Sequence, residues 1–280
     1  MKLTALLENT TDCPDILTRH GLSLYLETAH HKILFDFGPD DSFARNAEQL
    51  GVDLSAVDLA VLSHGHDDHG GGLRTFLEIN HTAPVYIRET AFRPHWSGRG
   101  MIGLDASLKH HPQIVLTGTS CTIDDTLRLI SGVTGRKFFA SSNAKLLMST
   151  ADGARLPDDF SHEQSLIVRE GDVCLLIAGC AHCGIVNVLE RAESEVGHPM
   201  THVVSGFHLC QPSKNINEPE ETVCAIAREL VKRPSRYYTC HCTGLPSYRI
   251  LNRETAGQVS YLSGGCSLSF DTQNTRLNCR

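Results

Sequence analysis

Short apolar stretches of strand length alternate with polar turns along the first third of the chain. They predict β-strands at residues 3–7, 22–26 and 32–37. The continuous apolar stretch 58–63 predicts a strand that is buried on both faces. Residues 41–50 and 73–79 place apolar side chains at helical spacing and therefore predict helices. Residues 64–72 are too rich in Gly and His to predict either element.

The second half of the chain repeats this alternation with longer helical segments. Helical spacing predicts helices at 185–196 and 219–231, and a Glu-Gly-Asp turn predicts a hairpin of strands 165–169 and 173–178. Further strands are predicted at 201–205, 237–240, 259–262 and 267–270. The strands come in two batches, each followed by helices. This order predicts an α+β fold in which two packed sheets carry helices on their outer faces, as a single domain over 1–280.

Composition narrows the class of protein. The 280 residues include 25 Lys and Arg against 32 Asp and Glu, and 41% are hydrophobic, as in ordinary globular proteins. The net charge of −7 disfavours a nucleic-acid partner, which would need a basic surface. No apolar stretch approaches the roughly 20 residues that span a bilayer, and no signal peptide is evident, so no membrane partner is expected. The 11 Cys lie partly in apolar or His-rich segments, which favours a reduced protein of the cytoplasm.

The strongest chemical signal is the sequence His-Gly-His-Asp-Asp-His at residues 64–69. Three imidazoles and a carboxylate follow directly after the predicted buried strand. On a helix these side chains would point around the axis, whereas on a tight turn they can converge. Imidazole nitrogen and carboxylate oxygen are preferred ligands of zinc and similar cations. The spacing therefore predicts a metal site at the end of this strand.

With this motif, the chain resembles the metallo-β-lactamase superfamily of metal-dependent enzymes along nearly its whole length. The superfamily's first motif, an Asp that ends an early strand, matches Asp36 in Leu-Phe-Asp-Phe-Gly. The resemblance implies an αββα sandwich of two mixed β-sheets. It implies that His64 and His66 hold one metal ion while Asp68 and His69 hold a second. It also implies that Asp36 orients these ligands by hydrogen bonds; the alternative for Asp36 is a turn or helix-capping carboxylate.

Three later histidines each end an apolar strand beside a Gly, and we expect them at the same edge of the sandwich: His182, His208 and His241. By resemblance, His182 is a third ligand of the first metal ion and His241 is a ligand of the second. The bridging carboxylate that is usual in the superfamily is not evident, because Gly179-Cys180 stands where strand-Gly-Asp is expected. His208 either takes this vacant role or donates a hydrogen bond to a substrate oxyanion or phosphate.

Several phrases resemble one subgroup of the superfamily more closely. The subgroup is named for 7,8-dihydropterin-6-methyl-4-(β-D-ribofuranosyl)aminobenzene 5′-phosphate synthase. The phrases are Gly-Cys-Ala-His-Cys-Gly-Ile-Val-Asn at 179–187, Ser-Gly-Phe-His-Leu at 205–209 and Cys-His-Cys-Thr-Gly at 240–244, with His-Glu-Gln at 162–164 and Val-Thr-Gly at 133–135. They are specific for the subgroup and not for the named reaction, because the group is broad.

Two features near the predicted site have alternative interpretations. Four thiols surround His182 and His241: Cys180, Cys183, Cys240 and Cys242. They are either metal ligands or a redox pair, or small apolar side chains packed beneath the site, which is the favoured interpretation. The sequence Gly-Gly-Gly at 70–72 could present amide groups to an anion. The favoured interpretation is that these glycines allow a tight turn of the loop at residues 64–72, called the metal loop below.

The mixed ligand set favours a catalytic site over a closed structural one. An open metal ion acidifies bound water and polarises a bound oxygen. Asp68 is expected to accept a proton from that water in addition to ligating. A di-iron redox centre is disfavoured, because flavodiiron relatives place an acidic residue where this chain has His66.

Three functions remain open at this stage. The first is a metal-dependent enzyme acting on a small phosphorylated or pterin-like substrate. The second is a generic metal-dependent hydrolase of esters or phosphodiesters, and the third is a catalytically silent metal-binding or sensor protein. The expected cofactor is one or two divalent ions, zinc first, with iron or manganese as the other candidates. An irregular insertion around 90–160 is expected to cover the substrate and to supply anion contacts from Arg88, Arg93, Arg99, Lys109, Arg136, Lys137 and Lys145.

Overall fold

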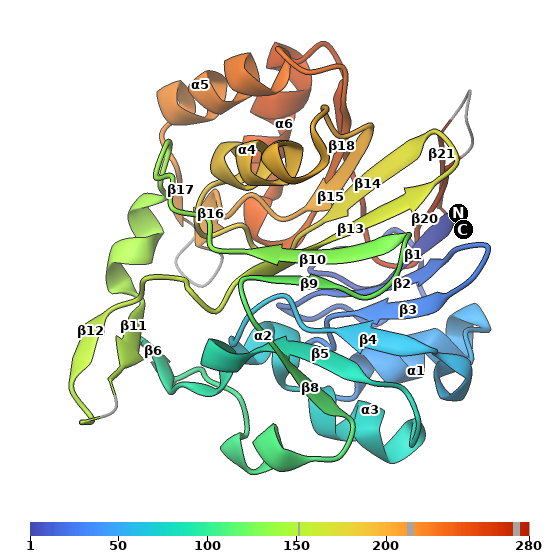
Figure 1. The fold of residues 1–280 in the computed structure, drawn as a ribbon. Coiled ribbons are helices and arrows are strands. Elements are labelled where there is room, and N and C mark those ends of the chain that lie inside the picture. Colours follow the sequence, from blue (N-terminus) through green and yellow to red (C-terminus); the bar gives the residue numbers. More distant parts are fainter. Residues whose placement is uncertain (151, 212–215, 271–274, 280) are drawn as a thin grey trace.

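Two β-sheets packed face to face form the centre of the computed structural model, which describes residues 1–280 except 151, 212–215, 271–274 and 280 (Figure 1). Among the described residues, the first sheet has eight strands in the order β21-β20-β1-β2-β3-β4-β5-β8. The second has seven, in the order β19-β18-β15-β14-β13-β10-β9. Both sheets combine parallel and antiparallel pairs. The predicted class of fold is confirmed.

The strands of both sheets are short. Those of the first sheet are β1 (Lys2–Leu7), β2 (Ser23–Glu27), β3 (Lys32–Phe35), β4 (Leu59–Val61), β5 (Val85–Arg88), β8 (Ile114–Thr117), β20 (Ser267–Ser269) and β21 (Arg276–Asn278). Those of the second are β9 (Ser120–Thr122), β10 (Leu127–Ser131), β13 (Gln164–Glu170), β14 (Val173–Ile177), β15 (His202–Ser205), β18 (Arg236–Thr239) and β19 (Val259–Tyr261).

Helices cover the outer face of each sheet, as Figure 1 shows. The first sheet carries α1 (Ser42–Leu50) and α3 (Leu73–Ile79), and the second carries α4 (Ile185–Val196), α5 (Glu220–Leu230) and α6 (Leu245–Glu254). The short helix α2 (Asp67–Gly70) lies within the metal loop. Single 3₁₀ turns occur at Leu54–Ala56, Glu89–Phe92, Ala106–His110, Ser141–Lys145 and His241–Thr243. None of the described helices is long and apolar enough to cross a membrane.

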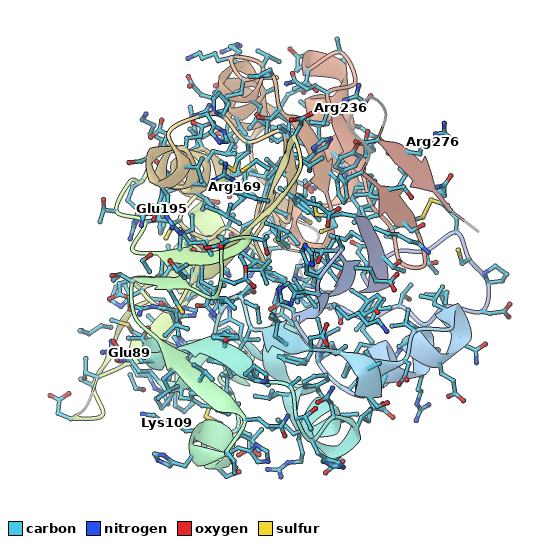
Figure 2. The ribbon with its side chains drawn as sticks, turned by 45° about the vertical axis from the view of Figure 1, so that its right-hand side comes forward. Glu89, Lys109, Arg169, Glu195, Arg236 and Arg276 are labelled. Carbon is cyan, nitrogen blue, oxygen red and sulfur yellow. A yellow bond between two sulfur atoms is a disulfide. The ribbon has the colours of Figure 1, made fainter. Side chains whose placement is uncertain are left out.

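Three layers of apolar side chains hold the sheets and helices together. The layer between the sheets contains Phe35 and Val61 from the first sheet and Leu166 and Leu175 from the second. A second layer lies under α4, α5 and α6, and a third under α1 and α3. Figure 2 shows side chains filling the interior of the molecule, while labelled charged residues such as Arg236 lie at the periphery. Apolar burial therefore fixes the sandwich independently of the polar loops at its edges.

Two short β-structures lie beside the sandwich, and the insertion forms the first of them. A four-stranded sheet joins β6 (His95–Ser97), β7 (Gly100–Met101), β11 (Leu147–Ser149) and β12 (Arg155–Pro157). It extends from one end of the molecule in Figure 1. A second pair, β16 (Cys210–Gln211) and β17 (Ile216–Asn217), follows β15. These elements stand over the loop edge at which the predicted ligands gather.

The metal loop is more regular than its sequence predicts. The expectation of no helix within 64–72 is wrong at α2, because the amides of Gly70 and Gly71 bond to the carbonyls of His66 and Asp67. The amide of Gly72 bonds to the carbonyl of Gly38, so these three amides serve the turn and not an anion. A Cβ on Gly71 would lie 2.2 Å from the Pro39 carbonyl oxygen. The three glycines therefore allow the tight turn that was favoured.

The expectation of uniformly reduced cysteines is wrong at the last strands. Cys266 and Cys279 form a disulfide, which joins the residue before β20 to the residue after β21. The two strands already pair antiparallel, with Leu268 opposite Leu277. The bond therefore reinforces an existing contact of neighbouring strands. Cys180, Cys183, Cys240 and Cys242 are not in disulfides.

Candidate metal centre

The loops that follow five strands meet at one edge of the sandwich, beside a cleft of about 850 Å³. Strands β3 and β4 are parallel, and so are β14, β15 and β18, so their carboxyl ends share that edge. The cleft is lined by several predicted residues: His66, Asp68, His182, His208 and His241. His64, His69 and Asp36 are buried beside them. The structure thus brings together the predicted site residues, which are spread over two sheets.

Four of these histidines have one ring nitrogen held by an oxygen atom. The Nδ1 atoms bond to Ser63 Oγ at 2.8 Å for His64, Asp36 Oδ2 at 2.6 Å for His69, Asn143 Oδ1 at 3.0 Å for His182 and Asn9 Oδ1 at 2.8 Å for His241. An amide or carboxylate oxygen only accepts, so Nδ1 carries a proton, which in a neutral ring leaves the lone pair on Nε2. Ser63 Oγ acts in the same way, because it donates to Asp36 Oδ2 at 2.7 Å. This arrangement is typical of metal-ligating histidines.

The free Nε2 atoms lie where a cation would satisfy them. The Nε2 atoms of His64 and His182 are buried and have no hydrogen-bond partner among the described residues. The Nε2 atoms of His69 and His241 lie 3.2 Å apart, so one proton can be shared between them in the metal-free protein and a cation can take its place. Two nitrogens that bind one tetrahedral zinc ion are about 3.3 Å apart. The residues present therefore fit a divalent metal ion.

The candidate ligands fall into two groups. His64, His66 and His182 offer nitrogens that lie within 4.8 Å of one another. In the second group, Asp68 Oδ2 lies 3.4 Å from His241 Nε2 and 4.0 Å from His69 Nε2. The groups correspond to the two metal positions implied by the family resemblance. Each combines side chains from both sheets.

Asp36 forms hydrogen bonds that hold the metal loop in place. Its carboxylate accepts hydrogen bonds from Ser63 N and Ser63 Oγ, both at 2.7 Å, and from His69 Nδ1. The residue itself is fully buried and has a φ of 64°, a strained value for a side chain other than Gly. It does not bond to the amino end of α1, where a capping carboxylate would act. Asp36 is therefore placed to orient His64, through Ser63, and His69.

Two further buried carboxylates hold the other ligand loops. Glu163 accepts the amides of His182 at 2.6 Å and Cys183 at 3.1 Å. Glu8 accepts the amide of His241 and the hydroxyl of Tyr261. Sequence reasoning assigned neither carboxylate to the site, since each acts on a residue far away in the chain. Together they fix the backbone from which His182 and His241 project.

The electrostatic environment keeps most candidate ligands ready to bind a cation. Burial, together with neighbouring imidazoles, holds the pKa of His64 and His182 well below the usual value, so both are neutral. Burial opposes ionisation of Asp68, but His69 and His241 hold its pKa well below the ordinary carboxyl range. Burial also opposes charge on His69, yet Asp36 and Asp68 raise its pKa to about 9. In the metal-free protein, His69 therefore carries a proton near neutral pH.

Metal affinity is expected to increase as the pH rises. Below the raised pKa of about 9 for His69, a metal ion must displace a proton, whereas above it no proton is lost from this group. Each displaced proton increases the apparent affinity about tenfold per pH unit. Competition with a chromophoric chelator at several pH values between about 6 and 9 measures this slope. An affinity that does not change with pH would contradict the expected displacement.

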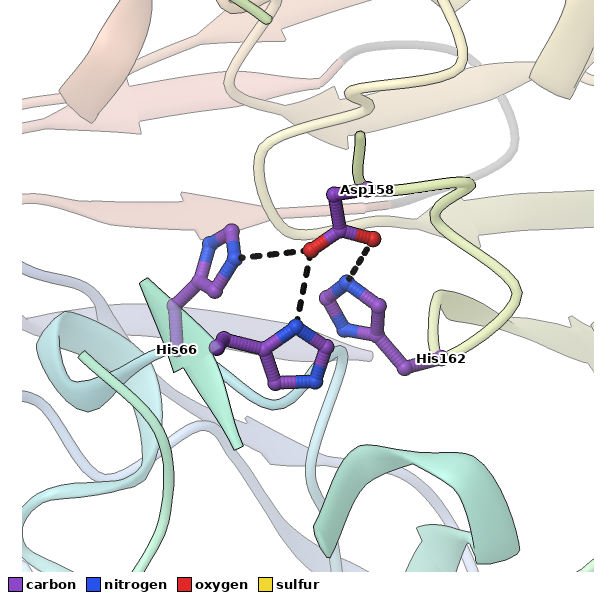
Figure 3. Close-up of side chains that lie close together, drawn as sticks. His66, Asp158 and His162 are labelled. Atoms are coloured by element: carbon purple, nitrogen blue, oxygen red, sulfur yellow. Dashed lines mark hydrogen bonds and ion pairs between the residues drawn. The ribbon is translucent and has the colours of Figure 1, made fainter. Parts of the chain in front are cut away.

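His66 is held differently, by a carboxylate from the insertion (Figure 3). Asp158 Oδ2 lies 3.8 Å from His66 Nε2 and 2.7 Å from His95 Nδ1, and Asp158 Oδ1 lies 3.2 Å from His162 Nε2. The amide of Gly65 donates to His162 Nδ1, so the proton of His162 lies on Nε2 and faces Asp158. Burial opposes ionisation of Asp158, but the three imidazoles lower its pKa. Asp158 therefore anchors the outer side of His66.

Asp158→Asn is expected to weaken metal binding about 10- to 100-fold, the usual cost of losing a partner of a ligating histidine. The amide has no charge to hold His66, His95 and His162 together. Chelator competition measures the change. Asp159→Asn is the matched control, because Asp159 is exposed and its side chain accepts the nearby amide of Ser161. Equal affinities of the two variants would show that Asp158 does not position His66.

The structure places two more histidines at the cleft. The ring centroid of His208 lies 4.0 Å from that of His182, and both its ring nitrogens are buried without a hydrogen-bond partner among the described residues. His20 Nε2 lies 3.3 Å from Asp68 Oδ2. Burial and the neighbouring His241 lower the pKa of His20 to about 4. His20 was missed from the sequence, because it lies in an irregular loop with no ligand spacing.

The insertion supplies one wall of the cleft. Of the seven cations expected to contact an anion, Arg99 and Lys145 line it. They stand beside the apolar side chains of Ile102, Leu146 and Leu147. Others are engaged elsewhere: Arg88 donates to two backbone carbonyls, and Lys137 pairs with Glu190. The cleft thus offers positive charge and apolar surface together.

The four thiols near the site separate into two pairs. Cys183 and Cys240 are buried and do not line the cleft, as expected for packing beneath the site. Cys180 and Cys242 line it, so the packing interpretation does not describe them. Cys242 Sγ accepts the amide of His208 at 3.3 Å. Cys180 Sγ lies 3.1 Å from His69 Nε2.

Comparisons with known proteins show the family to which the chain is related. The sequence profile of the metallo-beta-lactamase superfamily matches residues 17–216. The chain is 30% identical to the uncharacterized protein MJ0448 of Methanocaldococcus jannaschii, over 92% of this chain and 98% of that one. It is 25% identical to the 7,8-dihydropterin-6-methyl-4-(beta-D-ribofuranosyl)-aminobenzene-5′-phosphate synthase of the same organism, over 90% of each chain. Among solved structures, it resembles Tm1679, a metal-dependent hydrolase of the beta-lactamase superfamily, with a TM-score of 0.82, 26% identity, and coverage of 97% of this chain and 99% of that chain.

Proposed function

Since this chain belongs to the metallo-β-lactamase superfamily, we propose that it is a metal-dependent enzyme acting on a small anionic substrate, of the phosphorylated or pterin-like class. The observation that carries the proposal is the set of histidines whose Nδ1 atoms are held by oxygen atoms while their Nε2 atoms face one region, those of His64 and His182 without a partner among the described residues. The cleft beside them has the positive charge that an anionic substrate requires.

We assign the candidate ligands to two metal positions. His64, His66 and His182 would hold one divalent ion, and Asp68, His69 and His241 the other, with zinc first among the metals. Asp36 would orient the ligands of both groups. A divalent ion in such a site supplies Lewis-acid polarisation of a substrate oxygen and acidifies water.

Other residues of the chain would bind the substrate and transfer protons. Arg99 and Lys145 would hold the anionic group, and the apolar wall beside them would contact a flat ring. Asp68 would accept a proton, because its low pKa keeps the carboxylate ionised. His208 would donate a hydrogen bond to charge that develops on the substrate. The insertion around 90–160 would cover the bound molecule.

Support for the pterin-like class comes from the synthase that is 25% identical over 90% of the chain. A generic hydrolase of esters or phosphodiesters is the second candidate, and it is favoured by the structural similarity to the hydrolase Tm1679. In a silent metal-binding protein, protein ligands would fill every coordination position of the metal ions. The wide cleft beside the candidate ligands leaves room for a further ligand, which disfavours this alternative. The thiols at 180, 183, 240 and 242, which form no disulfide, support a cytoplasmic location, whereas the Cys266–Cys279 disulfide argues against it.

One experiment tests the proposed function. Protein purified without added metal is subjected to elemental analysis and then assayed with phosphoester, thioester, lactone and dihydropterin-type substrates. We expect about one to two equivalents of metal and turnover that a chelator abolishes. Less than a tenth of an equivalent, with no uptake on titration, would contradict the metal assignment. Bound metal without turnover of any substrate, and without an exchangeable ligand position, would favour the silent metal-binding protein.

His208→Ala is expected to separate metal binding from substrate contact. If His208 donates to the substrate, metal content stays at the wild-type value while kcat/KM falls about 100-fold, as for other oxyanion donors. If His208 is a ligand, metal content falls together with turnover. Elemental analysis and kinetics on the best substrate distinguish the two roles. Unchanged metal and unchanged turnover would show that His208 is structural.

A further inference from the structure

The Cys180 side chain occupies the point where the two ligand groups meet. Its Sγ atom forms a group with one ring nitrogen each of His64 and His69, in which all three atoms lie within 4.8 Å of one another. The same holds for Cys180 Sγ with His182 and His208, and for Cys180 Sγ with His241 and Cys242. Cys180 is 3% exposed and is not in a disulfide. Its sulfur is therefore within reach of both proposed metal positions.

The backbone holds Cys180 in this place from both sides. A Cβ on the preceding residue, Gly179, would lie 2.2 Å from Ser63 Oγ, so only Gly lets β14 approach the metal loop so closely. The carbonyl of Gly179 accepts the amide of Gly206 at 2.8 Å, which ties the turn to the end of β15. Ala181 follows with a φ of 50°. The turn thus directs Cys180 between the sheets at the point where the ligand loops converge.

We propose that the Cys180 thiolate bridges the two metal ions, so that a sulfur takes the place of the missing bridging carboxylate. The inference rests on the metal site of the proposed function. On binding, the Sγ–H bond breaks, the proton leaves to solvent, and two lone pairs of the sulfur form one bond to each ion. No oxidation or reduction is involved.

A bridging thiolate also narrows the identity of the metal. Sulfur is a soft ligand that selects zinc or iron over manganese, which prefers oxygen. Cys242 does not occupy the equivalent place, because its Sγ accepts the amide of His208 and lies 3.7 Å from the carbonyl oxygen of Cys180. The pair of ions bound here is therefore expected to be zinc or ferrous iron.

Cobalt substitution tests the bridge without an activity assay. Wild-type protein loaded with about two equivalents of Co²⁺ should show a near-ultraviolet thiolate-to-cobalt charge-transfer band. It should also show loss of the high-spin cobalt EPR signal as the second equivalent couples to the first through sulfur. Cys180→Ala should lack both features and bind at least one ion about 100-fold more weakly. Cys183→Ala, a buried residue of the same loop that does not line the cleft, should retain both.

The variant Cys180→Asp and the outcomes below distinguish a bridging thiolate from other arrangements. Cys180→Asp should still bind about two equivalents of cobalt without the charge-transfer band, because a carboxylate can also bridge. A band that survives in Cys180→Ala, or one that is lost only in Cys242→Ala, would overturn the proposal. Wild-type protein that binds about two equivalents without any band would overturn the bridge and leave the metal site standing. Wild-type protein that binds no cobalt, zinc or iron would overturn the proposed function as well.

Discussion

Replacing His66 with Ala is expected to abolish turnover while leaving the fold in place. His66 lines the cleft and belongs to the first ligand group, so its loss removes one of three nitrogens from that metal position. Lewis-acid stabilisation of several kcal/mol is then lost, and about 4 kcal/mol corresponds to a decrease in kcat/KM of roughly 1,000-fold. Metal content is expected to fall from about two equivalents towards one. The folded core is unaffected, because it depends on apolar burial away from this loop.

Kinetics, elemental analysis and circular dichroism measure the three parts of this prediction. His81→Ala is the matched control, because His81 is exposed and does not line the cleft. It should retain turnover and metal. If His66→Ala failed to fold while metal-free wild-type protein stayed folded, His66 would have a structural role that the proposed site does not include.

Replacing Asp36 with Ala is expected to lower the free energy of unfolding of the metal-free protein by about 3–5 kcal/mol. The carboxylate is fully buried and pairs with His69, whose raised pKa of about 9 keeps it charged at neutral pH. Removal leaves His69 Nδ1, and the amide and hydroxyl of Ser63, without their acceptor, so that His69 must either keep an unpaired charge or release its proton. An uncompensated buried charge is costly because the interior solvates it poorly. The corresponding decrease in Tm is roughly 6–15 °C.

Urea denaturation near neutral pH with chelator present measures the effect. Asp41→Ala serves as the control, because Asp41 is exposed, makes no capping bond to α1 and pairs only with the exposed Arg45. Its loss should change the stability by less than about 1 kcal/mol. The difference between the variants should shrink as the pH rises from about 6.5, the ordinary pKa of His, to about 9, the raised pKa of His69 in the wild type. A decrease for Asp36→Ala no larger than that of the control would show that Asp36 does not stabilise the metal loop.

The periodicity of apolar residues predicted most of the fold, because strand and helix burial leave a clear pattern. Helices α3 and α4 have the predicted bounds. Helix α6 was missed, since only Ser247 and Leu251 of its residues are buried and it shows little apolar periodicity. Strand β5 was missed as well, although its Val85 and Ile87 are buried. Short elements at the margin of the core are therefore the least predictable part.

The candidate ligands could be predicted because each follows an apolar strand, and the strand order brings those ends to one edge. The residues behind them could not. Asn9 and Asn143 accept from His241 and His182 across 232 and 39 residues of sequence, and nothing local marks them. Asp158 is one of two adjacent aspartates in the insertion, and only the folded chain distinguishes it from Asp159. Partners in the second layer depend on tertiary contact alone.

The distribution of the ligand groups over both sheets has a consequence for biosynthesis. During translation, His64 to His69 emerge long before His182 and His241. Strand β1 cannot pair with β20 until nearly the whole chain has been made. A metal ion that arrives early meets only part of its final ligand set and can exchange. Secure capture would therefore follow completion of both sheets, so metal acquisition is expected at the last stage of maturation rather than in the ribosome-bound chain.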